Sequence, residues 1–251
     1  MATILVGVDP STSQPSLLQP VFPWVIFDMD GTLVDTFQLN LRAFNHAVGR
    51  FLKRPLATVE TLSIPGGTLE EQLTNFMPRA AVPRGIERYH AHYRHHFISG
   101  TRVFPGIRGL LFTLTARGVK LAVCTGADGQ IARHTLTRYG LSRFFTTVVT
   151  ADDVGQPKPD PEGLRIAMEK IGAESDQTVY VGDHPNDIRA SWNAGVKGAA
   201  ARWGSMHRKE LHQLKPDFFF KHPSEALSLS DFRIRIYSRQ PITAFTSVHN
   251  D

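Results

Sequence analysis

The sequence predicts an α/β protein built on a doubly wound parallel sheet, with an all-helical insert near its beginning. Short apolar runs alternate with stretches of helical periodicity along most of the chain. Nearly continuous apolar runs are typical of parallel strands that are buried on both faces. The runs cover residues 24–27, 119–125, 146–150, 178–183 and 198–202, and helical stretches such as 130–139 and 161–171 separate them. This alternation favours a parallel sheet covered by helices on both sides.

The insert follows the first strand and has helical patterns only. Its first apolar face is spaced by 4, 3, 4 and 3 residues, which predicts a helix through Phe37, Leu41, Phe44, Val48 and Phe51. Residues 68–71 read Thr-Leu-Glu-Glu, a capping-box pattern that predicts the start of a second helix. A third helix is predicted from Ile86, Tyr89, Tyr93 and Phe97. The pair Pro105-Gly106 then returns the chain to the core.

Bulk composition is that of an ordinary globular protein. The chain has 251 residues, of which 41% are hydrophobic and 20% charged. It has no apolar run of 18 residues, so we expect no transmembrane helix. One cysteine excludes an internal disulfide, and no Lys or Arg precedes Arg42, so a basic signal-peptide start is missing from this sequence. We therefore expect a cytoplasmic protein.

Two carboxylates directly follow the first predicted strand. Strand alternation puts Asp28 and Asp30 on the same side if the chain stays extended. They lie at the carboxyl end of the strand, where open α/β sheets bind ligands. Two like charges ~4 Å apart repel by ~4 kcal/mol at an effective dielectric constant of ~20. Such a pair needs a cation or a shared proton.

Four segments resemble the motifs of the haloacid dehalogenase-like hydrolases, in the same order. The segment Asp28-Met29-Asp30-Gly31-Thr32-Leu33-Val34-Asp35 is similar to the first motif. Residues 119–126, which end in Thr125-Gly126, are similar to the second. Lys158, within Gly-Gln-Pro-Lys-Pro-Asp-Pro, resembles the third, and the Gly-Asp-x-x-x-Asp of residues 182–187 resembles the fourth. The resemblance covers roughly residues 24–228.

The resemblance implies a Rossmann-like core and a helical cap. The core is expected over residues 23–35 and 106–230 and the cap over 36–105, with terminal extensions at 1–22 and 231–251. Most members of the family are phosphatases. In this chain the resemblance implies Asp28 as the nucleophile and Asp30 as the general acid and base.

The resemblance also implies a set of binding residues. Mg²⁺ would be held by the Asp28 side chain, the Asp30 backbone carbonyl and Asp183. Thr125, Gly126 and Lys158 would bind phosphate, while Asp187 would orient Lys158 or a metal-bound water. In the cap, the loop Gly66-Gly67-Thr68 is the expected substrate contact, because two glycines permit close backbone approach.

The expected partner is a small phosphorylated metabolite. Residues 36–108 hold ten Lys or Arg against four Glu, a net charge of +6, and a basic insert that faces an acidic core would concentrate anions there. We expect neither nucleic-acid nor membrane binding, since the basic residues are scattered and no binding motif accompanies them. The sequence leaves the oligomeric state open.

Within the family, Lys158-Pro159-Asp160-Pro161-Glu162 is most similar to the phosphoglycolate phosphatase and pyrophosphatase-like group. The expected substrate is therefore a phosphoglycolate-like monoester or pyrophosphate. Two alternatives stay open, a sugar phosphomutase of the same fold and a non-catalytic binding protein that retains it. A dehalogenase is disfavoured by Asp30, which the dehalogenases of the family lack.

Overall fold

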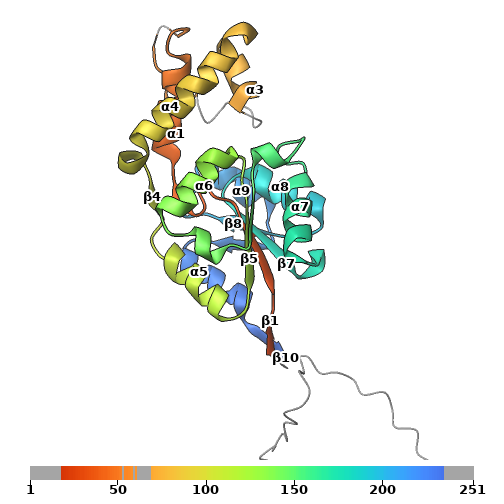
Figure 1. Ribbon diagram of the computed structural model, residues 1–251. Helices are drawn as coiled ribbons and strands as arrows, with labels where there is room; N and C mark the ends of the chain where they lie inside the picture. The colour runs from red at the N-terminus through yellow and green to blue at the C-terminus, as the bar shows by residue number, and fades with distance from the viewer. Residues whose placement is uncertain (1–17, 53, 59, 61–68, 235–251) are drawn as a thin grey trace, which may run out of the picture.

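A six-stranded parallel sheet forms the centre of the computed structural model, which describes residues 18–52, 54–58, 60 and 69–234 (Figure 1). The strand order is β6-β5-β2-β7-β8-β9. The strands are β2 (Trp24–Phe27), β5 (Lys120–Cys124), β6 (Thr147–Val149), β7 (Thr178–Gly182), β8 (Lys197–Ala201) and β9 (Phe218–Phe220). The first strand of the sheet in the sequence, β2, lies in its interior between β5 and β7. This α/β, Rossmann-like architecture confirms the predicted fold class.

Both faces of the sheet are buried, which explains the continuous apolar runs. Val25 and Phe27 point into one hydrophobic cluster, whereas Ile26 between them belongs to a second cluster on the opposite face. The first cluster is completed by α5 (Ile107–Ala116), α6 (Gly129–Arg138) and the 3₁₀ helix Pro223–Ser230. The second is completed by α7 (Glu162–Ile171) and α8 (Pro185–Ala194), against which α9 (Arg208–Leu214) packs.

The insert forms a helical cap beyond one end of the sheet (Figure 1). It contains α1 (Phe37–Val48), α3 (Leu69–Thr74) and α4 (Val82–Gly100), and α1 packs along α4. The chain leaves the core through β3 (Val34–Asp35) and returns through β4 (Arg102–Val103), and these two short strands pair antiparallel. The two segments that connect core and cap are therefore paired with each other as strands.

The predicted apolar face of the first cap helix is partly wrong. The helix ends at Val48, and Phe51 beyond it is 46% exposed. The buried face includes Leu39, Ala43 and Ala47, because this side of α1 packs on α4. Phe37 and Leu41 face a cavity between cap and core instead. Periodicity located the helix correctly but could not show that it lies between a neighbour and a cavity.

Two segments near the chain ends pair with each other. β1 (Leu18–Pro20) runs antiparallel to β10 (Phe232–Ile234) as a separate two-stranded sheet. The last strand of the main sheet was also not foreseen. No strand was predicted beyond residue 202, but Phe218–Phe220 extend the sheet as β9. Three consecutive aromatic residues satisfy the pattern of a strand equally well.

Candidate active site

Three strands of the sheet end in polar residues at adjoining positions. Asp28 follows β2, Thr125 follows β5 and Asp183 follows β7. Parallel pairing aligns Phe27 with both Val123 and Val181, so the carboxyl ends of the three strands lie side by side. The sheet therefore gathers the first, second and fourth motifs at one edge, below the cap.

Three carboxylates converge at this edge. One oxygen each from Asp28, Asp183 and Asp187 lies within 4.8 Å of the others. Asp28 is 4% exposed and Asp187 1% exposed, so water screens their repulsion poorly. Asp28 and Asp183 come from segments more than 150 residues apart, and they are close enough to share one cation.

Gly31 allows this approach. Its φ is +81°, a conformation that side-chain-bearing residues rarely adopt, and a Cβ at this position would overlap the carboxylate of Asp183. The hydroxyl of Thr32 donates to Asp183 Oδ1 at 3.3 Å, and the indole of Trp203 donates to the carbonyl of Thr32 at 2.9 Å. The turn formed by Gly31 and Thr32 thus packs directly against Asp183.

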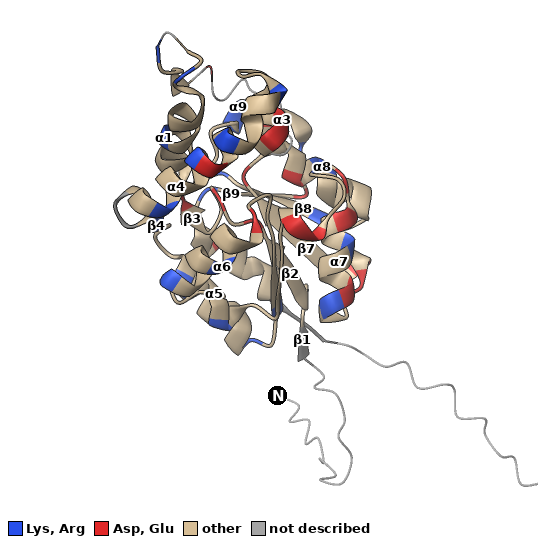
Figure 2. Ribbon diagram, turned by 45° about the horizontal axis from the view of Figure 1, so that its top comes forward, with Lys and Arg blue, Asp and Glu red and all other residues tan. Residues whose placement is uncertain are grey.

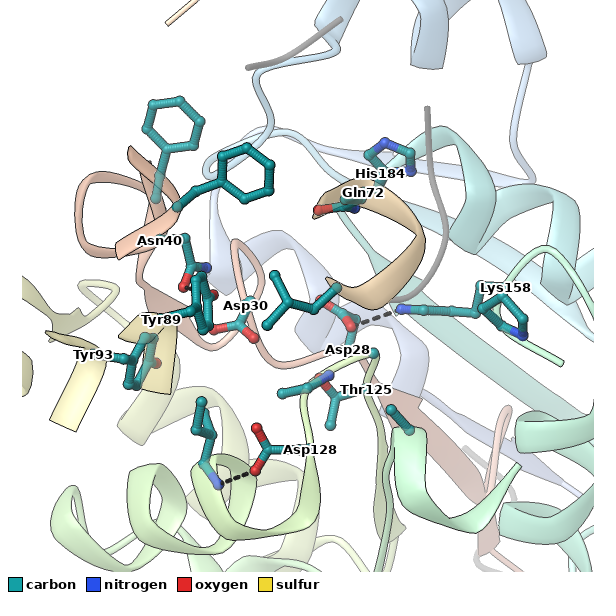
Figure 3. Close-up of a pocket in the computed structure, with 18 of the residues that line it drawn as sticks. Asp28, Asp30, Asn40, Gln72, Tyr89, Tyr93, Thr125, Asp128, Lys158 and His184 are labelled. Carbon is teal, nitrogen blue, oxygen red and sulfur yellow. Dashed lines mark hydrogen bonds and ion pairs between the residues drawn. The ribbon is translucent and has the colours of Figure 1, made fainter. Parts of the chain in front are cut away.

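Lys158 connects two of the three carboxylates. Its Nζ donates to Asp28 Oδ1 at 2.8 Å, to Asp187 Oδ1 at 2.6 Å and to the hydroxyl of Tyr180 at 3.0 Å. Burial alone would lower the pKa of Lys158, but Asp187 and Asp28 outweigh it and hold the pKa well above its ordinary value. The ammonium is therefore charged, and its three donors are all used; Figure 3 shows the contact with Asp28.

Asp187 is held by hydrogen bonds to Lys158 and to the start of α8. Its Oδ2 accepts the backbone N–H of His184 at 2.9 Å, which closes the capping box at the start of α8. Burial would raise the pKa of Asp187, yet Lys158 and the hydrogen bonds lower it overall. Both oxygens already have donors, which leaves Asp187 less free to bind a cation than Asp28 or Asp183.

The other two carboxylates have raised pKa values. Burial raises the pKa of Asp28 to about 7, with Lys158 opposing the rise and Asp187 adding to it. Burial raises the pKa of Asp183 as well, and the negative charges of Asp28 and Asp187 raise it further. The ordinary aspartate pKa of ~3.9 therefore does not apply to Asp28 in this environment. Crowded oxygen ligands of this kind fit a hard divalent cation such as Mg²⁺.

The carboxylate of Asp30 points away from this cluster and toward the cap (Figure 3). Its Oδ1 accepts the hydroxyl of Thr36 at 2.6 Å. Asn40 donates to the same hydroxyl at 3.3 Å and accepts from Tyr89 of α4 at 2.9 Å. Burial raises the pKa of Asp30, while the Thr36 hydrogen bond opposes the rise. A raised pKa suits a carboxyl that must carry a proton before it gives it away.

The expected phosphate-binding residues Thr125 and Gly126 follow β5 and line the cavity. Thr125 is buried, and its hydroxyl accepts the backbone N–H of Ala127 at 3.1 Å. Gly126 is exposed and lines the cavity beside it. The cap loop predicted to contact the substrate, Gly66-Gly67-Thr68, lies outside the described residues.

A cavity of about 550 Å³ joins the sheet edge to the cap. The expected core residues Asp28, Asp30, Thr125, Gly126, Lys158, Asp183 and Asp187 all line it. At its border, His90 of α4 contacts Asp128 at 3.1 Å between Nε2 and Oδ2, and this contact joins cap to core. Asp128 also caps α6 by accepting from the N–H of Ile131 at 2.9 Å.

Sequence reasoning missed three residues that shape this site. Tyr180 lies within β7 and supports Lys158, and a hydroxyl in an otherwise apolar strand was its only signal. Thr36 stands just after the first motif, where it reads as an ordinary start of a helix. Asp128 follows the second motif by two residues and has the composition of a helix cap, which it is.

The chain matches a known family over most of its core. The family described as haloacid dehalogenase-like hydrolases matches residues 25–201, more than half of the chain. A pyrophosphatase PpaX of Halalkalibacterium halodurans is 29% identical over 211 residues, which cover 84% of this chain and 98% of the relative. The pyrophosphatase PpaX of Anoxybacillus flavithermus is 30% identical and covers 82% of this chain and 95% of the relative.

Solved structures share the fold over the same region. A predicted phosphoglycolate phosphatase of Haemophilus somnus 129pt has a TM-score of 0.76 at 22% identity, covering 84% of this chain and 99% of the other. A hydrolase of Pseudomonas syringae has a TM-score of 0.71 at 26% identity, covering 81% of this chain and 95% of the other.

The sheet, the cap and the four motifs thus define a hydrolase of the capped α/β type. The chain belongs to the haloacid dehalogenase-like hydrolases. The resemblance seen in the sequence is confirmed, and so is the expectation of a hydrolytic enzyme. In the part of the chain that the structure describes, no helix has both the length and the apolar character needed to cross a membrane.

Proposed function

We propose that this protein is a Mg²⁺-dependent phosphatase that hydrolyses a small phosphorylated metabolite through an aspartyl-phosphate on Asp28. The observation that carries the proposal is the convergence of Asp28, Asp183 and Asp187 within 4.8 Å, with Lys158 Nζ 2.8 Å from Asp28. The pyrophosphatases to which the chain is similar support the phosphatase class.

Asp28 is the residue placed for attack on phosphorus. It lies at the bottom of the cavity, at the end of β2, and Lys158 holds one of its oxygens. A divalent ion held by Asp28, the Asp30 carbonyl and Asp183 would supply positive charge that keeps these carboxylates ionised and offsets the charge of the phosphoryl group. A bond forms between a carboxylate oxygen of Asp28 and phosphorus as the ester P–O bond breaks.

Asp30 is the residue placed for proton transfer. Its raised pKa lets it hold a proton, which it gives to the leaving oxygen of the alcohol. The carboxylate that results then takes a proton from the water that attacks the aspartyl-phosphate. Free phosphate leaves, and Asp28 and Asp30 return to their starting states.

Thr125, Gly126 and Lys158 are placed to hold the phosphoryl oxygens. The hydroxyl of Thr125 and the N–H of Gly126 lie beside the cavity at the end of β5. Positive charge and fixed donors aimed at a transferring group contribute several kcal/mol in a site that excludes water. Asp187 holds Lys158 in place, which makes it a positioning residue.

The test is release of inorganic phosphate from a panel of phosphate esters, phosphoglycolate and pyrophosphate, with Mg²⁺ and with EDTA. We expect turnover that EDTA removes and that Asp28→Asn abolishes, while circular dichroism shows that the variant is folded. Formation of an isomeric phosphate in place of free phosphate would identify the phosphomutase alternative. Absence of any product from the whole panel would favour the non-catalytic alternative.

A further inference from the structure

We infer that the substrate is a phosphate monoester whose alcohol part is uncharged and apolar or aromatic, and that a second anionic group is rejected. This inference rests on the proposed function, because it concerns the part of the substrate that extends from the phosphoryl site toward the cap. Three features of the cavity carry it: its charges, the side chains of its cap half and its size.

The cavity is strongly acidic. Its described lining contains six carboxylates, those of Asp28, Asp30, Glu70, Asp128, Asp183 and Asp187. Among these lining residues Lys158 is the sole Lys or Arg, and its three donors are already used by Asp28, Asp187 and Tyr180. Even with a divalent cation bound and Asp30 protonated, three positive charges would face five carboxylates. A carboxylate or second phosphate on the substrate would therefore find no free Lys or Arg among these residues.

The basic residues of the cap do not change this result. They gave the insert its net positive charge, and we expected them to face the site. Of the cap's described arginines, none lines the cavity. Figure 2 shows the basic segments of the cap distributed over its helices and connections. Of the cap residues that the structure does not describe, 61–68 contain neither Lys nor Arg, and Lys53 is the single basic residue. None of these described arginines can therefore contact a substrate inside the cavity, and attraction of the substrate by their longer-range field stays a prediction.

The cap half of the cavity is lined mostly by apolar and aromatic side chains, with Asn40, Glu70, Gln72 and His90 as its polar members. The apolar and aromatic members from the first and last cap helices are Phe37, Leu41, Phe44, Ile86, Tyr89 and Tyr93. Such a lining is typical of sites that bind the apolar body of a ligand. The volume of about 550 Å³ lies within the range of roughly 300–1,000 Å³ of pockets for drug-sized ligands. Phosphoglycolate or pyrophosphate would leave most of that space unfilled.

Asp128 is the residue best placed to reject an anion. It stands on the core side of the cavity (Figure 3). Its Oδ2 contacts His90 of the cap at 3.1 Å. Its carboxylate belongs to the wall of the cavity and would repel an anionic leaving group.

A matched pair of aryl esters tests the inference. Phenyl phosphate and 4-carboxyphenyl phosphate share one ring and have leaving groups of similar acidity, but they differ by one carboxylate. With Mg²⁺ present, we expect kcat/KM for release of inorganic phosphate to be about tenfold higher for phenyl phosphate, from the repulsion of like charges in a poorly solvated cavity. Phosphoglycolate and inorganic pyrophosphate complete the set and should also fall below phenyl phosphate.

Two Asp→Asn variants locate the source of the discrimination. Asp128→Asn keeps a good cap for α6 and removes the charge, so the preference for phenyl phosphate should shrink by about threefold. Asp152→Asn is the control, because Asp152 accepts the N–H of Gly129 at the start of the same helix at 3.0 Å but does not line the cavity. This control should leave the preference unchanged.

The outcomes separate the inference from the proposed function. Equal or faster turnover of 4-carboxyphenyl phosphate, phosphoglycolate or pyrophosphate would overturn the inference and leave the phosphatase intact. An unchanged preference in Asp128→Asn would overturn the role of Asp128. No phosphate release from any of the four compounds would refute the proposed function, and the inference with it.

Discussion

Replacing Asp187 by asparagine tests whether the buried ion pair with Lys158 holds the site together. Asp187 is 1% exposed in its side chain and Lys158 19% exposed, and 2.6 Å separates Oδ1 from Nζ. Asparagine can still accept the N–H of His184 with one oxygen. Its NH₂ group would then face the ammonium of Lys158, so a donor would replace an acceptor.

The cost follows from removing one partner of a buried pair. Breaking such a pair typically destabilises a protein by about 3–5 kcal/mol. Lys158 keeps Asp28 at 2.8 Å, so we expect the lower end, about 3 kcal/mol. In a domain of this size that corresponds to a Tm roughly 6–12 °C lower. Activity should fall by about 10–100-fold, as is usual when a group that orients the reacting residues is lost.

Asp217 provides a matched control for this variant. It also accepts from one lysine, Lys197 at 2.8 Å, and from one backbone N–H, that of Gly198 at 2.9 Å. The side chains are 50% and 27% exposed, so the same substitution should cost less than about 1 kcal/mol. Thermal unfolding followed by circular dichroism compares the two variants. Equal losses of Tm in Asp187→Asn and Asp217→Asn would refute the argument from burial.

The pH dependence of the same difference gives a second check. The pKa of Asp187 is lowered in the folded state, so its charged form stabilises the fold above the unfolded pKa. That stability is lost as the pH falls through the folded pKa. The Tm difference between the wild type and Asp187→Asn should thus be full at neutral pH and should disappear in strong acid. A difference that persists there would show that charge is not its cause.

Three further predictions concern the acids and the turn that receives them. Asp183→Asn should raise the Tm of the metal-free protein, since burial raises the pKa of this carboxyl, and it should remove the stabilisation by Mg²⁺ seen in thermal unfolding of the wild type. In EDTA the wild type should be more stable at pH 5.5 than at pH 8, because Asp28, whose folded-state pKa is about 7, binds a proton in this range in the folded state only. The variant Asp28→Asn should weaken this trend. Stability that rises with pH over this window would contradict the prediction. Gly31 and Gly118 have φ values of +81° and +80°. Alanine in this conformation should lower the free energy of unfolding by about 1–2 kcal/mol at either position, but only at Gly31 would the new Cβ overlap Asp183. Loss of Mg²⁺-dependent activity in Gly31→Ala alone is the expected result, and equal activity losses in the two variants would contradict it.

Most of the core could be predicted from local patterns. Each strand of the sheet except β9 was located by an apolar run, because strands buried on both faces need apolar side chains at consecutive positions. The first and last cap helices were located by their periodicity and the middle one by a capping-box pattern. The buried side of α1 was not predicted, since it depends on where α4 and the cavity lie. The exposed Phe51 shows the limit of the method.

The sequence by itself determined which chemical groups stand at the ends of β2, β5 and β7, because a motif is a local property of the chain. The division of labour among the acids was decided only by the tertiary structure. Asp187 is bound to Lys158 and to a helix start, and Asp30 turns toward Thr36. Asp28 is buried and Asp183 is partly buried beside it. Charge and pKa depend on neighbours brought together from distant segments, and no local pattern contains them. The acidic, apolar cavity beneath a basic cap has the same origin, because net charge counts residues and cannot show which way they face.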